Sequence, residues 1–84
     1  MIFREIGERI KQAREGSGLT QLELAVRLEC TQSALSNYEL GKRKLNLNLL
    51  IEIAQVLNKP IDYFTESTAE DRNEETSSLR LPRL

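Results

Sequence analysis

The sequence predicts an all-α fold, a compact bundle of five short helices. Apolar residues recur at three- and four-residue steps in several stretches of the chain, which is the spacing of one face of a helix. No stretch shows the strict apolar–polar alternation that is typical of a half-buried strand. With 84 residues the chain has room for one domain at most, and we expect this domain to cover residues 1–64.

The first predicted helix covers residues 3–16. Its apolar positions share one face and leave the charged residues between them to solvent. These positions are Phe3, Ile6, Ile10 and Ala13. Gly16 and Gly18 are expected to end the helix, because glycine readily takes the left-handed conformation of a helix stop.

Two short amphipathic segments follow in tandem, and each is opened by a threonine. Residues 20–28 begin with Thr20 and have Glu23 three positions later, which is the capping-box pattern of a helix start. Residues 31–39 begin in the same way with Thr31. Only two residues separate the segments, so the two helices must cross at a steep angle, as in a helix-turn-helix. That geometry pushes the second helix outward, where it can enter the major groove of DNA.

A fourth helix is predicted at 47–57, after a basic loop, with Asn46 as its cap. Its buried face consists of Leu50, Ile53, Ala54 and Leu57. Asn58 is expected to end this helix. Pro60 then suits the first turn of a short fifth helix that runs to about Phe64.

Residues 65–84 differ from the rest of the chain, because they contain no aromatic residue and few apolar ones. We expect a short, charged C-terminal tail, for which the sequence leaves two interpretations open. One is a disordered segment, and the other is a short helix over 68–76 that begins with a capping box of Ser67 and Glu70. The tail also has leucines that are candidates for dimer contacts: Leu79, Leu81 and Leu84.

The composition argues against several classes of function. The chain has no histidine, the commonest general base and metal ligand, and its single cysteine excludes an internal disulfide and a multi-cysteine zinc site. We therefore expect no metal and no cofactor. An enzyme is not expected either, because there is no phosphate-cradling glycine loop and no obvious carboxylate pair. The chain lacks a signal-peptide pattern and the run of about 18 apolar residues of a membrane span, which predicts a cytoplasmic protein without membrane contact.

The net charge of −1 is unusual for a DNA-binding protein, but its distribution is informative. Residues 1–64 contain nine basic and eight acidic residues, whereas residues 65–84 contain three and five. A basic run of Lys42, Arg43 and Lys44 follows the predicted helix at 31–39, which is the candidate recognition helix because it could enter the major groove. Non-specific DNA affinity comes mainly from such local phosphate contacts, so the total charge is a weak counter-argument. A solvated surface loop is the alternative interpretation of this run.

Three sequence elements stand in a characteristic order along the chain. They are Thr-Gln-x-x-Leu-Ala at 20–25, Ser-x-x-Glu-x-Gly at 36–41 and Ile-Ala-x-x-Leu at 53–57. In this respect the chain resembles, over residues 7–64, the Cro/CI-type helix-turn-helix family of phage repressors and bacterial regulators, often called the XRE family. The resemblance implies a five-helix, lambda-repressor-like DNA-binding domain.

The resemblance also implies which side chains have functional roles. The residues that would face base edges are Gln32, Ser33, Ser36 and Asn37. The residues that would contact phosphates are Gln21, Thr31, Lys42 and Lys44. Arg14 and Glu39 match a pair that forms a buried salt bridge in relatives. Without the resemblance, polar side chains on an exposed helix face would be interpreted as solvated residues.

Some positions depart from the family pattern. Relatives commonly have glycine where this chain has Glu29, and a left-handed conformation would strain a glutamate, so a slightly different turn is expected. Leu22 and Val26 stand where relatives often have polar residues. They either add to the core or form an exposed patch for a partner.

The function expected from these observations is sequence-specific binding of double-stranded DNA by a transcriptional regulator. A repressor is the simplest case, because occlusion of an operator requires binding alone. A homodimer on a palindrome is expected, because one short recognition helix reads too few base pairs. The candidate dimer contacts, which would otherwise complete the core, are Leu49, Val56, Ile61 and Tyr63. The alternatives are an antitoxin that binds its operator and a toxin, and a helical protein-interaction module.

Overall fold

The computed structural model describes residues 2–66, and it confirms the all-α fold. These residues form α1 (Ile2–Gly16), α2 (Gln21–Leu28), α3 (Gln32–Glu39), α4 (Leu47–Leu57) and α5 (Ile61–Thr65). Every helix begins and ends within one residue of its predicted range. A membrane-spanning helix needs about 20 mostly apolar residues, and no helix within the described range has that combination of length and hydrophobicity. The expected helix at 68–76 and the tail leucines (Leu79, Leu81 and Leu84) lie outside the described residues.

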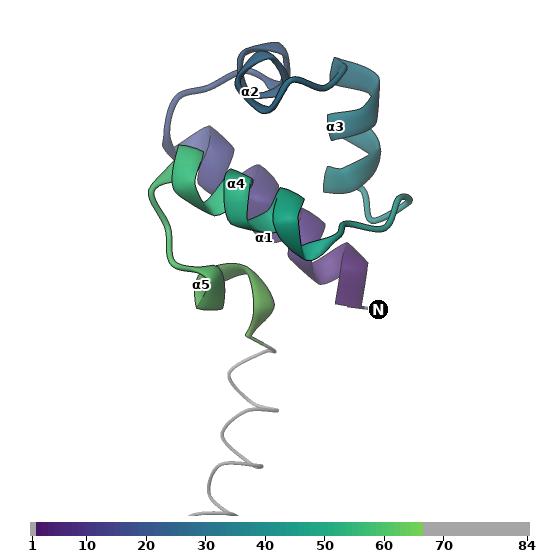
Figure 1. The fold of residues 1–84 in the computed structure, drawn as a ribbon, viewed down its shortest axis with the longest axis vertical. Helices are drawn as coiled ribbons and strands as arrows, with labels where there is room; N and C mark the ends of the chain where they lie inside the picture. Colours follow the sequence, from purple (N-terminus) through teal and green to yellow (C-terminus); the bar gives the residue numbers. More distant parts are fainter. Residues whose placement is uncertain (1, 67–84) are drawn as a thin grey trace, which may run out of the picture.

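The helices are arranged so that the α2–α3 pair stands at one end of the domain. Figure 1 shows α2 and α3 at the top, α4 crossing in front of α1 in the middle, and α5 below them. α1 packs against α3, α4 and α5, while α2 packs against α3 and α4. The long helix α1 therefore supports α3, α4 and α5, and it fixes the position of α3.

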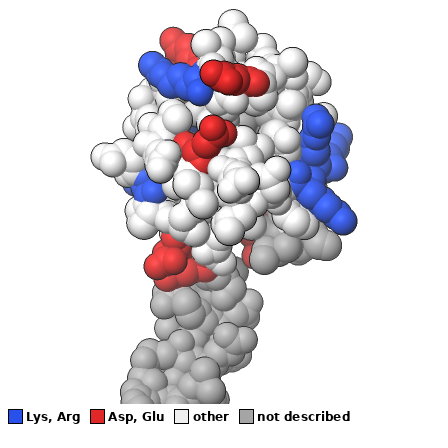
Figure 2. All heavy atoms as spheres, in the orientation of Figure 1, with Lys and Arg blue, Asp and Glu red and all other residues white. Residues whose placement is uncertain are grey.

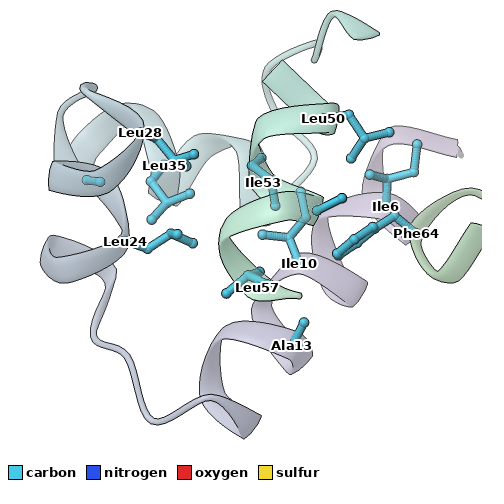
Figure 3. Close-up of a cluster of buried hydrophobic side chains, with 12 residues drawn as sticks. Ile6, Ile10, Ala13, Leu24, Leu28, Leu35, Leu50, Ile53, Leu57 and Phe64 are labelled. Atoms are coloured by element: carbon cyan, nitrogen blue, oxygen red, sulfur yellow. The ribbon is translucent and has the colours of Figure 1, made fainter. Parts of the chain in front are cut away.

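The core receives a fully buried side chain from every helix. Ile10 of α1, Leu24 of α2, Leu35 of α3 and Ile53 of α4 have no exposed surface, and Phe64 of α5 has 1% (Figure 3). Burial of such a side chain contributes roughly 1.5–3 kcal/mol. Because the helices are short, they depend on this shared core more than on their intrinsic propensity.

The predicted caps set the starts of α2, α3 and α4. The Thr20 hydroxyl accepts a hydrogen bond from the Glu23 N–H at 3.0 Å, and the Glu23 carboxylate accepts one from the Thr20 N–H at 2.9 Å. This second bond, from the backbone of Thr20, lowers the pKa of Glu23 below its usual value. Thr31 and Asn46 cap the next two helices through their side-chain oxygens. The capping interpretation of these residues is confirmed.

The connection between α2 and α3 has the left-handed residue that glycine usually supplies. Glu29 has φ 58° and ψ 42°, and its N–H donates to the carbonyl oxygens of Ala25 and Val26. The expectation that a glutamate would alter the turn is therefore wrong. A side chain at this position has a conformational cost, but Glu29 is exposed and its backbone bonds are kept.

Glycines allow α1 and α3 to approach very closely. A Cβ atom at Gly7 would overlap the carbonyl oxygens of Tyr38 and Glu39, and one at Gly41 would overlap the backbone of Arg4. Gly41 also has a φ of +75°, which favours glycine. These contacts hold the C-terminal end of α3 against the N-terminal half of α1.

Candidate nucleic-acid interface

The accessible surface of α3 is polar. Leu35 and Glu39 point into the domain and are buried. None of the four residues expected to face base edges is buried: Gln32 and Ser33 are exposed, and Ser36 and Asn37 are half-buried. α3 thus presents two amides and two hydroxyls on its accessible surface, and these groups can both donate and accept hydrogen bonds.

The Arg14–Glu39 ion pair implied by the resemblance is present, and it is buried. Arg14 is 8% exposed and Glu39 is 4% exposed. The Arg14 guanidinium donates to Glu39 through two nitrogens, Nε to Oε2 at 2.6 Å and Nη2 to Oε1 at 3.2 Å. Its Nη1 donates to the Leu19 carbonyl oxygen at 2.9 Å. The pair joins α1 to α3 and to the segment that leads into α2.

A line of side-chain hydrogen bonds runs from this ion pair to the start of α3. Gln21, the first residue of α2, donates from Nε2 to Glu39 Oε1 at 3.0 Å. Gln32, the first residue of α3, donates from Nε2 to Gln21 Oε1 at a longer distance of 3.5 Å. Gln21 was expected to contact a phosphate. The structure shows that its side-chain amide also bonds to Glu39 and Gln32 within the domain.

The other residues expected to contact phosphates flank α3: Thr31 directly precedes it, and Lys42 and Lys44 lie in the loop that follows it. The Thr31 hydroxyl accepts from the Ala34 N–H at 3.0 Å, which leaves its own proton available for donation. Lys42, Arg43 and Lys44 are all exposed. Arg43 lies over the ring of Tyr38, with its Cζ 5.5 Å from the ring centroid. Figure 2 shows basic side chains gathered at the edge of the molecule where the α3–α4 loop lies.

Two basic residues of α1, which the sequence interpretation missed, border the same region. Arg4 and Lys11 line a hollow of about 400 Å³ together with Lys42 and Leu40. Glu8 and Glu39 line the hollow too. Gly41 was the sequence signal that could have indicated that α1 lies close to this loop. Its close approach to the backbone of Arg4 becomes visible only in the folded chain.

The four candidate dimer residues do not form one surface. All four are partly buried and pack against the core, as the alternative interpretation states. Leu49 and Val56 lie on one flank of α4 by helical spacing. Ile61 lies on the other flank, in a hollow that it shares with Ile51 and Pro60. Tyr63 contacts Phe64 edge-on, with 5.0 Å between the ring centroids.

Leu47 and Ile51 are the more exposed apolar side chains of α4, with 65% and 37% of their surface accessible. They lie four residues apart and therefore on the same side of the helix. This spacing was visible in the sequence, but the sequence could not show that these two side chains remain accessible in the folded domain.

Leu22 and Val26 form an exposed patch on α2 and do not add to the core. They are 56% and 66% exposed. Together with Glu23 and Arg27 they line a shallow hollow. The structure thereby excludes the interpretation that these residues add to the core.

Two short helices joined by a left-handed residue, with a polar second helix facing outward, define the helix-turn-helix class of DNA-binding fold. A family model described as helix-turn-helix matches residues 10–64. The chain belongs to this helix-turn-helix family, in its Cro/CI or XRE type.

Curated relatives have the names of transcriptional regulators. The chain is 32% identical over 74 residues to the HTH-type transcriptional regulator ImmR of Bacillus subtilis, which covers 88% of this chain and 58% of the relative. It is 34% identical over 65 residues to the uncharacterised HTH-type transcriptional regulator RP497 of Rickettsia prowazekii, covering 77% and 50%. The chain therefore spans about half the length of these relatives.

Solved structures share the fold. The restriction-modification controller protein C.AhdI of Aeromonas hydrophila aligns with a TM-score of 0.70 and 24% identity, over 74% of this chain and 90% of that protein. The clp gene regulator ClgR of Corynebacterium glutamicum aligns with a TM-score of 0.77 and 20% identity, over 99% and 88%. At these identities the likeness concerns the fold alone.

Proposed function

We propose that this chain binds a specific sequence in double-stranded DNA and regulates transcription. The observation that supports this most directly is α3 itself. It is a short helix held at the end of the domain, and its accessible surface bears Gln32, Ser33, Ser36 and Asn37. Side chains of these types recognise base edges when a helix lies in the major groove.

In this proposal the two sets of polar residues have different tasks. The amides of Gln32 and Asn37 can each direct one N–H and the carbonyl oxygen at a base, which matches N7 and N6 of adenine. Gln21, Thr31, Lys42 and Lys44 contact phosphates and fix the position of α3 along the groove. Arg4, Lys11 and Arg43 extend the basic border of this surface.

The proposed regulator is a repressor that binds a palindromic operator as a homodimer. A two-fold axis would place the two α3 helices about 34–36 Å apart, one turn of DNA. The apolar surface that favours pairing consists of Leu47, Ile51 and Ile61, with Ile51 and Ile61 lining one hollow. Occlusion of a promoter by such a dimer requires no further activity.

A protein-interaction role is the second candidate, and the exposed patch of Leu22 and Val26 favours it. A mobility-shift titration separates the two. A DNA-binding protein retards mixed-sequence duplex DNA at low salt, and its affinity for this DNA falls as the salt concentration rises. Its affinity for the preferred duplex falls less over the same range of salt concentration. Failure to retard any duplex at about 50 mM salt, where phosphate contacts are strong, would contradict the proposed function.

A further inference from the structure

We infer that Glu39 is a positioning residue for base recognition, although its side chain is buried. It acts through Gln21, whose amide it orients, and Gln21 in turn orients the amide of Gln32. The inference rests on the proposed DNA-binding function and deepens it. It assigns specificity to a side chain that would touch neither bases nor phosphates.

The first step concerns the carboxylate. Glu39 is held by two nitrogens of Arg14, and a carboxylate in an ion pair can only accept hydrogen bonds. Its Oε1 lies 3.0 Å from the side-chain nitrogen of Gln21. The opposite amide orientation would place the Gln21 carbonyl oxygen against this carboxylate, and two acceptors repel. The ion pair therefore permits one orientation of Gln21.

The second step concerns Gln32. With its nitrogen toward Glu39, Gln21 turns its Oε1 toward α3, where the side-chain nitrogen of Gln32 lies 3.5 Å away. One N–H of Gln32 is thereby directed at Gln21. Its second N–H and its carbonyl oxygen remain available as a donor beside an acceptor, the pattern that pairs with adenine.

An unconstrained amide at Gln32 would present this pattern in either direction. Gln32 is exposed, and Gln21 is its one side-chain hydrogen-bond partner among residues 2–66. A glutamine that can turn over discriminates less between bases, because both orientations are populated before binding. The buried charge thus supplies the preorganisation that the exposed side chain lacks.

The test compares discrimination rather than affinity. The base pair read by Gln32 is identified as the one whose preference disappears in Gln32→Ala. Glu39→Gln gives Gln21 a partner that can either donate or accept, so the ratio of affinities for the preferred and the changed base pair should fall by about tenfold. Binding to random duplex should change little, because phosphate contacts remain. Ile53→Val, a core truncation without a link to this network, should leave the ratio unchanged.

Gln21→Met keeps the length of the side chain, removes both hydrogen bonds and does not disturb the ion pair. It should lower the same ratio, and Glu39→Gln should then add nothing further, since residues in one network are coupled. An unchanged ratio in Gln21→Met would overturn the inference even if Glu39→Gln folds poorly. A wild-type protein without any base preference would refute both the inference and the proposed function, whereas preference that is insensitive to both variants would refute the inference alone.

Discussion

Gln32 is the side chain whose proposed role is most specific. It begins α3, is exposed and has an orienting contact with Gln21. Gln32→Ala should weaken binding to the preferred duplex by roughly 1–3 kcal/mol and leave random duplex nearly unaffected. Parallel titrations of both duplexes measure this. Gln12→Ala, an exposed glutamine of α1, is the control and should change neither. Equal losses on both duplexes would exclude base recognition by Gln32.

The buried Arg14–Glu39 pair is expected to stabilise the fold. Removal of a buried partner leaves a charge without compensation, so Glu39→Ala should lower the free energy of unfolding by roughly 3–5 kcal/mol. Glu15 is the matched control, because it also lies within 3.9 Å of Arg14 but has a 57% exposed side chain. Glu15→Ala should cost less than about 1 kcal/mol. Urea denaturation that shows equal, small losses would mean that the buried pair does not stabilise the fold.

At the scale of elements, the α3–α4 loop should bind phosphates without regard to sequence. Lys42→Ala and Lys44→Ala should each weaken all duplexes alike and reduce the slope of log affinity against log salt by about 0.9. Lys59→Ala is the control, because it removes the same charge at a site away from this loop. The Lys59 Nζ lies 4.9 Å from the ring centroid of Tyr63. It should leave the slope unchanged. A slope that responds equally to all three variants would indicate a general charge effect.

The helix boundaries could be predicted because their causes are local. Thr20, Thr31 and Asn46 each cap a helix through a neighbour three residues away, and such spacing is visible in the sequence. The expected change of the turn at Glu29 was wrong, because this residue takes the left-handed conformation, keeps its backbone bonds to Ala25 and Val26 and leaves its side chain exposed.

The candidate site could be predicted only in part, for a related reason. The polar residues of α3 follow from helical spacing together with the family resemblance. The hydrogen bonds that Gln21 donates to Glu39 and that Gln32 donates to Gln21 join residues 18 and 11 positions apart, on different helices. No periodicity indicates such contacts, because they depend on how closely α1, α2 and α3 pack.

For the whole molecule, the proposed dimer predicts an effect of the α4–α5 surface on DNA binding. Ile51→Glu introduces a charge at a side chain that is 37% exposed, so the domain should still fold. The variant should dissociate into monomers and lose most of its affinity for a palindrome, while its affinity for a single half-site is kept. Val26→Glu makes the same change on α2, at 66% exposure, and should preserve the dimer. Sedimentation and titration that show no difference between the variants would contradict this interface.

Selection of bound sequences from a random duplex pool tests directly whether α3 of this protein reads DNA sequence. We expect convergence, over successive rounds, on a two-fold symmetric motif whose half-sites lie about 10 base pairs apart, centre to centre. The preference at one position of each half-site should disappear when the selection is repeated with Gln32→Ala. A pool that remains random after repeated rounds, although the protein is folded and retains duplex DNA, would contradict base recognition by α3.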